Sequence, residues 1–187
     1  MLQPTDESAP YSDITISPTG TLYAVFSSDT DMSGVYRSAD DGATWTNITP
    51  TNFPVSYNRL VLDIAPSNEN ILYLLGHISD EGPENHLLWK YTYVSGDGSG
   101  SNGQWSDLST NLPAYGGEVG DFDSQYGYDL IVKIKPDDDN TVYIGGTNLY
   151  MSTSGFADSN STSWVGGYST DNNYSGYDNQ HSDQHSL

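Results

Sequence analysis

The sequence predicts an all-β protein, a β-propeller arc of about three four-stranded antiparallel blades followed by the start of a fourth. Three observations predict it: the composition, a strand pattern that occurs three times, and a tryptophan that returns about every 60 residues. Only 35% of the 187 residues are hydrophobic, and the chain contains 19 Gly and 9 Pro. This composition disfavours a helical bundle and suits short strands joined by tight turns.

The first strand of each repeat ends in proline. These segments are DITISP at 13–18, LVLDIAP at 60–66 and LIVKIKP at 130–136. Their branched residues favour a pleated, largely buried strand. The turns that follow, PTG, PSNEN and PDDDN, combine the fixed φ of proline with small polar residues that tolerate the left-handed conformation. Each proline is therefore expected to close a strand and to open a hairpin.

Three further strands complete each repeat. The second strands are TLYAVF, ILYLLG and TVYIGG, the third carry GVYRS, LLWKYTY and NLYMS, and the fourth begin at Trp45, Trp105 and Trp164. We therefore expect one partial propeller over residues 1–187, with blade 1 at about 11–49, blade 2 at about 59–108 and blade 3 at about 128–168. The terminal HSDQHSL, residues 181–187, stands where the next first strand would start. Because a single blade cannot bury both faces, the missing blades are expected from a longer chain or from other copies in a dimer or fibre.

The segment SADDGATW at 38–45 matches the pattern S-x-D-x-G-x-T-W between a third and a fourth strand. Serine and aspartate oxygens accept hydrogen bonds from turn amides, glycine permits positive φ, and tryptophan packs between sheets. The matching residues are Ser38, Asp40, Gly42, Thr44 and Trp45. The third repeat departs from the pattern with STSGF at 152–156, and the second has SGDGSGSNGQ at 95–104, which predicts a flexible linker.

This pattern resembles the Asp box of the BNR-repeat propellers, a group that includes sialidases, sortilin-like receptors and xyloglucan-cleaving endoglucanases. The whole chain also looks like secreted BNR-type proteins of Bacteroidetes-like bacteria, which often end in sorting domains for export to the cell surface. The resemblance implies a propeller fold and an extracellular or cell-surface location. It also implies that the Asp box is structural and lies away from any catalytic centre.

Charge and composition exclude several classes of partner and chemistry. The chain has 25 acidic and five basic residues, a formal charge of −20 that repels nucleic-acid phosphates and anionic lipid, so neither a nucleic acid nor membrane insertion is expected. The absence of cysteine excludes disulfides and thiolate chemistry. The N-terminal segment has neither the basic start nor the hydrophobic stretch of a secretion signal. The 15 Tyr and 4 Trp nevertheless suit a surface exposed outside the cell.

Long loops at one rim of the predicted blades carry the candidate ligand-binding residues, which are Tyr115, Asp121, Phe122, Asp123, Tyr126, Tyr174 and Tyr177. Exposed rings can stack on the C–H faces of sugars, and carboxylates accept hydrogen bonds from sugar hydroxyls. The alternative is that these are solvated acidic loops whose rings pack locally.

No cofactor is assigned, but two kinds of cation site are considered, one for a transition metal and one for Ca²⁺. His181, Asp183 and His185 alternate, so a strand would project all three to one face and two imidazoles with a carboxylate could bind a divalent transition metal. The alternative is a polar strand that lines the central channel. Ca²⁺ could be held by Asp29 with Asp31, or by the acidic turn at 137–139.

The sequence therefore predicts a non-catalytic scaffold, secreted or at the cell surface, that binds a carbohydrate or protein or assembles with itself, for example into a fibre. The alternative is part of a polysaccharide-cleaving glycoside hydrolase of the xyloglucanase type, which needs two carboxyl groups. The candidates for these groups are Asp63 and the pairs Asp121 with Asp123 and Asp80 with Glu84, and the second carboxylate could lie beyond Leu187. A sialidase needs several arginines, whereas only Arg37 and Arg59 are present, and both are expected to be structural.

Overall fold

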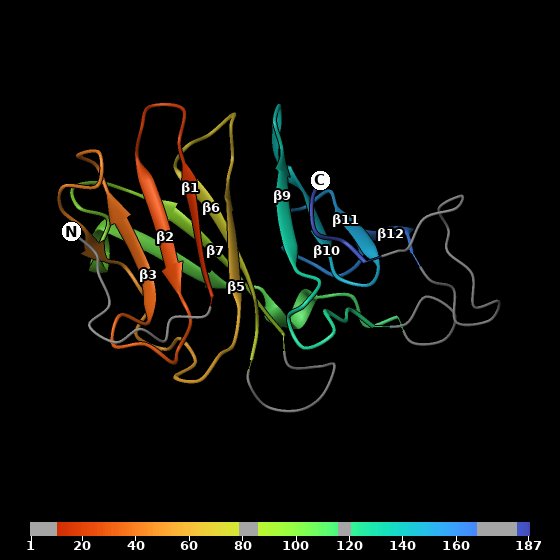
Figure 1. The fold of residues 1–187 in the computed structure, drawn as a ribbon. Helices are drawn as coiled ribbons and strands as arrows, with labels where there is room; N and C mark the ends of the chain where they lie inside the picture. Colours follow the sequence, from red (N-terminus) through yellow and green to blue (C-terminus); the bar gives the residue numbers. More distant parts are fainter. Residues whose placement is uncertain (1–10, 79–85, 116–120, 168–182) are drawn as a thin grey trace.

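A computed structural model describes residues 11–78, 86–115, 121–167 and 183–187, and the chain is all-β over these ranges (Figure 1). The strands form three four-stranded antiparallel sheets in which each strand pairs with its neighbours in the sequence. The described residues close no barrel, which is consistent with a partial arc. The fold class predicted from the sequence is therefore confirmed.

The strands of each sheet follow one another without a crossover. The first sheet contains β1 (Ser12–Ile16), β2 (Leu22–Phe26), β3 (Gly34–Ser38) and β4 (Thr46–Asn47). The second contains β5 (Leu60–Ile64), β6 (Ile71–His77), β7 (His86–Tyr93) and β8 (Gly103–Asp107). The third contains β9 (Ile131–Lys135), β10 (Asp138–Gly145), β11 (Leu149–Ser152) and β12 (Thr162–Gly166). Two 3₁₀ turns, η1 (Gly100–Asn102) and η2 (Ser109–Asn111), flank β8.

The first strand of each sheet lies at the centre of the arc. β1, β5 and β9 are adjacent in the middle of Figure 1, and β5 contacts both of the others. The remaining strands of each sheet lead outward from this centre. The middle sheet is consequently covered on both faces, and all seven residues of β6 are buried.

Two hydrophobic cores fill the spaces between the sheets. Successive residues of a strand point to opposite faces, so β6 contributes to both cores. Leu72 and Leu74 belong to the core shared with the first sheet, whereas Tyr73 and Leu75 belong to the core shared with the third. This two-sided burial explains why the β6 segment is an unbroken apolar run in the sequence.

Two aspartates join the central strands along their inner edges, where no strand is paired with them. Asp13 Oδ2 accepts a hydrogen bond from Leu62 N at 3.0 Å, which links β1 to β5. Asp63 Oδ2 accepts one from Ile134 N at 2.8 Å, which links β5 to β9. Each carboxylate therefore satisfies a backbone N–H that the sheet itself leaves unpaired.

The structure differs from two expectations about loops. The glycine-rich segment at 95–104 is a compact turn that includes η1, not a flexible linker, because backbone and side-chain hydrogen bonds tie it together. The acidic segment PDDDN at 136–140 is partly strand, since Asp138 already pairs with Lys135 across a turn of two residues. In both places local hydrogen bonds override what composition indicates.

Candidate functional site

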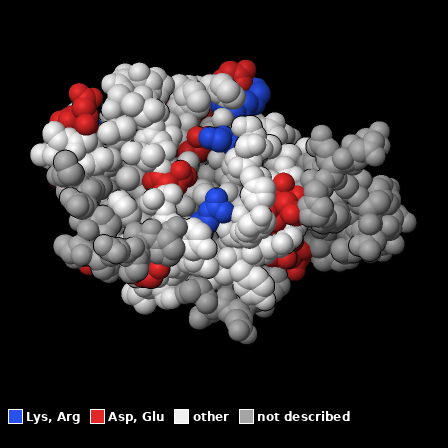
Figure 2. Space-filling view, viewed as in Figure 1, with Lys and Arg blue, Asp and Glu red and all other residues white. Residues whose placement is uncertain are grey.

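A pocket of about 330 Å³ lies at the centre of the arc and is lined by β1, β5, β9 and residues 185–187. In Figure 2, acidic and basic side chains lie together in the hollow between the sheets. Two of the five basic residues of the chain, Arg59 and Lys133, line this pocket. The central strands therefore place charged groups at the centre of the arc.

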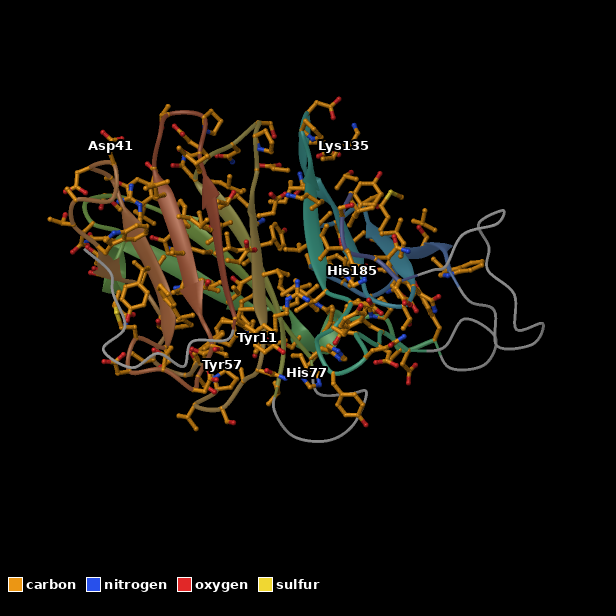
Figure 3. The ribbon with its side chains drawn as sticks, in the orientation of Figure 1. Tyr11, Asp41, Tyr57, His77, Lys135 and His185 are labelled. Carbon is orange, nitrogen blue, oxygen red and sulfur yellow. The ribbon has the colours of Figure 1, made fainter. Side chains whose placement is uncertain are left out.

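The charged groups of this pocket are already engaged. Lys133 Nζ lies 3.0 Å from Asp63 Oδ1. His185 Nε2 lies 3.1 Å from Asp129 Oδ1, and the Asp129 side chain is fully buried. Figure 3 shows His185 beside β9. The charged side chains of this pocket therefore pair within the protein, and these pairs explain their presence structurally.

The loop that enters β9 presents exposed tyrosines on a tightly held backbone. Arg59 Nη1 donates hydrogen bonds to Gly127 O at 2.9 Å and to Tyr128 O at 2.7 Å. Gly127 N donates to Ser124 Oγ at 3.0 Å. Tyr126 is 69% exposed and Tyr128 is 64% exposed. Arg59 thus has a structural contact, and the two rings project from a loop with little freedom.

The other described ligand candidates have different surroundings. Tyr115 is 45% exposed, and its hydroxyl donates to Thr162 O at 2.7 Å. Asp121 pairs with Ala114 through an isolated bridge, and Asp123 Oδ1 accepts a hydrogen bond from Gln125 N at 2.9 Å. Tyr174 and Tyr177 lie outside the described residues.

The expectation that Phe122 is an exposed ring is wrong. Its side chain is 3% exposed and packs in the core between the second and third sheets. Its ring contacts those of His86 and Tyr150, with centroids 4.9 Å and 6.2 Å away. Phe122 anchors the loop that presents the tyrosines, because burial of its ring stabilises that packing.

Next to Phe122 lies a buried histidine pair that sequence reasoning missed. The rings of His77 and His86 meet at 5.3 Å, and His86 Nε2 is 2.6 Å from Ser124 Oγ. Burial lowers the pKa of His77, and the negative charge of Asp123 opposes this shift. Figure 3 shows His77 at the same end of the molecule as Tyr57 and Tyr11. Both histidines stand at strand termini with no signature spacing, so only the fold pairs them.

The turn at 38–45 is closed by its own side chains. Ser38 Oγ donates to Asp40 Oδ1 at 2.8 Å and accepts from Gly42 N at 3.0 Å. Asp40 accepts from the hydroxyl of Thr44 at 2.6 Å and from its N–H at 2.8 Å, and these bonds lower the pKa of Asp40 to about 2. Trp45 Nε1 donates to Gly42 O at 3.0 Å. Every bond stays within the turn, which is a structural arrangement.

The third sheet has a similar turn despite its divergent sequence. Ser152 Oγ accepts from Phe156 N at 2.9 Å, as Ser38 Oγ does from the residue four positions later. Gly155 and Phe156 have φ of 61° and 58°, and Asp41 and Gly42 have φ of 57° and 83°. Serine and two left-handed residues therefore suffice for this turn, whereas the aspartate is replaceable.

The structure gives the proposed metal ligands other partners. His181 lies outside the described residues, and residues 183–187 form no strand, so the alternation that would align the three side chains does not apply there. His185 pairs with Asp129, and Asp183 Oδ1 accepts from Gln125 Nε2 at 3.4 Å. No group of three potential metal ligands occurs among the described residues.

The acidic groups considered for Ca²⁺ also have separate partners. Asp137 pairs with Lys135 at 2.6 Å, and Asp138 accepts from the Thr141 hydroxyl at 2.7 Å. Asp139 accepts from Asn68 Nδ2 at 2.9 Å. Asp29 accepts from the hydroxyl of Ser27. The carboxylates of the 137–139 turn are thus directed to different neighbours.

Of the carboxylates considered for glycoside cleavage, Asp63 has structural partners. Asp63 holds a backbone N–H and Lys133. Asp80 and Glu84 lie outside the described residues.

Comparison with known protein families and with curated proteins finds no match. Within the described ranges, no helix has the length and apolar character needed to cross a membrane. The functional argument therefore depends on the geometry of the chain itself.

Proposed function

We propose that this protein is a non-catalytic binding scaffold, a partial β-propeller of the BNR or Asp-box kind that recognises carbohydrate or protein at a cell surface. One observation carries the proposal: Tyr126 and Tyr128 are exposed on a loop whose backbone Arg59 and Ser124 hold in place. An aromatic ring that is fixed before binding loses little entropy when it contacts a ligand. The −20 charge favours neutral or cationic ligands.

Self-association is the second part of the proposal. Ile14 and Ile16 are each 60% exposed on the face of β1 that alternates with Asp13 and Thr15. Exposed apolar side chains on a sheet face favour contact with another sheet, in the way that the second sheet covers the first. The scaffold would thus complete its arc with further blades, either of a longer chain or of another copy.

Binding is tested by affinity electrophoresis through gels that contain plant or microbial polysaccharides. The wild-type protein should be retarded by at least one polymer, and a Tyr126→Ala/Tyr128→Ala variant should lose most of this retardation. Tyr143→Ala is the matched control, because Tyr143 is a half-buried tyrosine in the middle of β10. Retardation that persists in the double variant would contradict the role of these rings.

The hydrolase alternative predicts new reducing ends in the same polymers, whereas the scaffold leaves them intact. Self-association is measured by light scattering over a range of concentrations. The wild-type mass should rise with concentration, and an Ile14→Ser/Ile16→Ser variant should stay monomeric. A wild-type protein that is monomeric throughout would refute assembly without affecting the binding proposal.

A further inference from the structure

A second pocket, of about 360 Å³, lies between the outer parts of the first and second sheets. Its lining residues are Ile48, Thr49, Pro50, Thr51, Asn52, Gly98, Gly100, Gly103 and Trp105. They come from the segment after β4 and from the glycine-rich turn that leads into β8. We call this pocket the outer groove. Its volume falls within the range of small-molecule sites.

The outer groove is uncharged in a strongly acidic chain. None of its nine lining residues is Asp, Glu, Lys, Arg or His, although the formal charge of the protein is −20. The pocket at the centre of the arc is different, because Asp13, Arg59, Lys133 and His185 line it. A neutral lining gives no compensation for the desolvation of a charged ligand, so it selects against charge.

Trp105 forms a fixed aromatic wall of the groove. Its Nε1 donates a hydrogen bond to Ile48 O at 2.7 Å, across the boundary between the two sheets. Its ring packs on Tyr91 with centroids 4.9 Å apart, and Tyr91 in turn donates to Gly98 O at 2.7 Å. The indole and the glycine-rich turn are thus held together, and Trp105 remains only half-buried.

Two exposed lining residues of the groove offer hydrogen-bonding groups. Thr51 and Asn52 are exposed, and among the described residues neither side chain has a hydrogen-bond partner. A hydroxyl and an amide supply both donors and acceptors. Gly100 adds room, since a Cβ built on it meets no atom within 4 Å.

We infer that the outer groove binds an uncharged segment of an oligosaccharide, with Trp105 against a sugar ring and Thr51 and Asn52 bonded to sugar hydroxyls. A neutral sugar presents C–H groups to an aromatic face and hydroxyls at its edge, which matches this pairing of indole with neutral polar groups. The inference rests on the proposed binding function and adds to it a second site with a specified ligand class. It is separate from the loop that carries Tyr126 and Tyr128.

Calorimetric titration with cellohexaose, xylohexaose and mannohexaose tests this inference, with hexagalacturonate as a charged probe. The wild-type protein should bind at least one neutral hexamer and should bind hexagalacturonate at least about tenfold more weakly, a factor that corresponds to about 1.4 kcal/mol. Thr51→Trp, which fills the groove, and Trp105→Phe, which removes the bond to Ile48 O, should each weaken binding by about tenfold. Thr110→Trp is the matched control, because Thr110 is an exposed threonine in η2 outside the groove.

Three results would overturn the inference: no neutral hexamer binds, the charged hexamer binds most tightly, or Thr51→Trp and Trp105→Phe bind like the wild type. The two proposals fail separately. If the groove variants keep wild-type affinity while Tyr126→Ala/Tyr128→Ala loses binding, the groove assignment is wrong and the scaffold function stands. If the wild-type protein binds neither the polymers nor the hexamers, the carbohydrate function itself is wrong.

Discussion

Removal of the Asp63 carboxylate should weaken the contact between the second and third sheets and lower the free energy of unfolding. Asp63 is 8% exposed, and it accepts a hydrogen bond from Ile134 N and pairs with Lys133. In Asp63→Ala the buried N–H of Ile134 loses its partner, which costs about 1 to 3 kcal/mol. The ion pair adds at most about 1 kcal/mol, because the Lys133 side chain is 43% exposed and solvent screens it.

The combined loss is about 1 to 4 kcal/mol, and urea unfolding followed by tryptophan fluorescence measures it. With a denaturant slope of about 2 kcal/mol per molar, the midpoint should fall by about 0.5 to 2 M. Asp63→Asn is the matched control, because its amide oxygen still accepts from Ile134 N while the charge is lost, so its midpoint should fall by less than about 0.5 M. An alanine variant that unfolds like the wild type, or an asparagine variant as unstable as alanine, would refute the reasoning.

Three further predictions concern pH and backbone strain. The pKa of Asp40 falls from 3.8 to about 2 on folding, so the stability that its carboxylate contributes is present above about pH 4 and is lost as the pH falls toward 2. Between about pH 4 and 2 the urea midpoint of Asp40→Asn should therefore fall less than that of the wild type. Burial lowers the pKa of His77 below 6.5, so stability is lost as the pH falls below this value, and His77→Phe should lose less stability than the wild type in thermal unfolding between about pH 7 and 5. Gly155→Ala forces alanine to φ 61° and places its Cβ against the Tyr73 hydroxyl, which should cost about 1 to 3 kcal/mol and lower the melting temperature by several degrees. The control Gly20→Ala, at φ 97° in open space, should unfold at a higher temperature than Gly155→Ala.

Strands and turns could be predicted where local chemistry decides them. The proline-closed first strands and the residues of the Asp40 turn act within a few positions of one another, so their spacing in the sequence is their spacing in space. The same reasoning was wrong for the 95–104 segment, because glycine content indicates freedom but does not reveal that Tyr91 and Asp97 hold the turn. It was also wrong for Phe122, since an aromatic in a polar loop can be buried by a distant sheet.

The candidate site was less predictable than the fold. Tyr126 could be proposed as an exposed ring from its loop, whereas the support from Arg59 crosses 68 residues of sequence. Trp105 was assigned only as a marker of the fourth strand, and its place in the outer groove depends on Ile48 of the preceding sheet. The pairing of His77 with His86 likewise requires the register of β6 against β7.

The order of apolar and turn-forming residues alone determined that this chain forms repeated four-stranded antiparallel sheets, because strand alternation and hairpin geometry are properties of short segments. The tertiary structure decided which side chains serve that framework and which remain available to a ligand. Burial and the hydrogen bonding of polar groups depend on neighbours from other sheets. For this reason Asp63 forms a hydrogen bond from β5 to β9, whereas Thr51 and Asn52 are exposed.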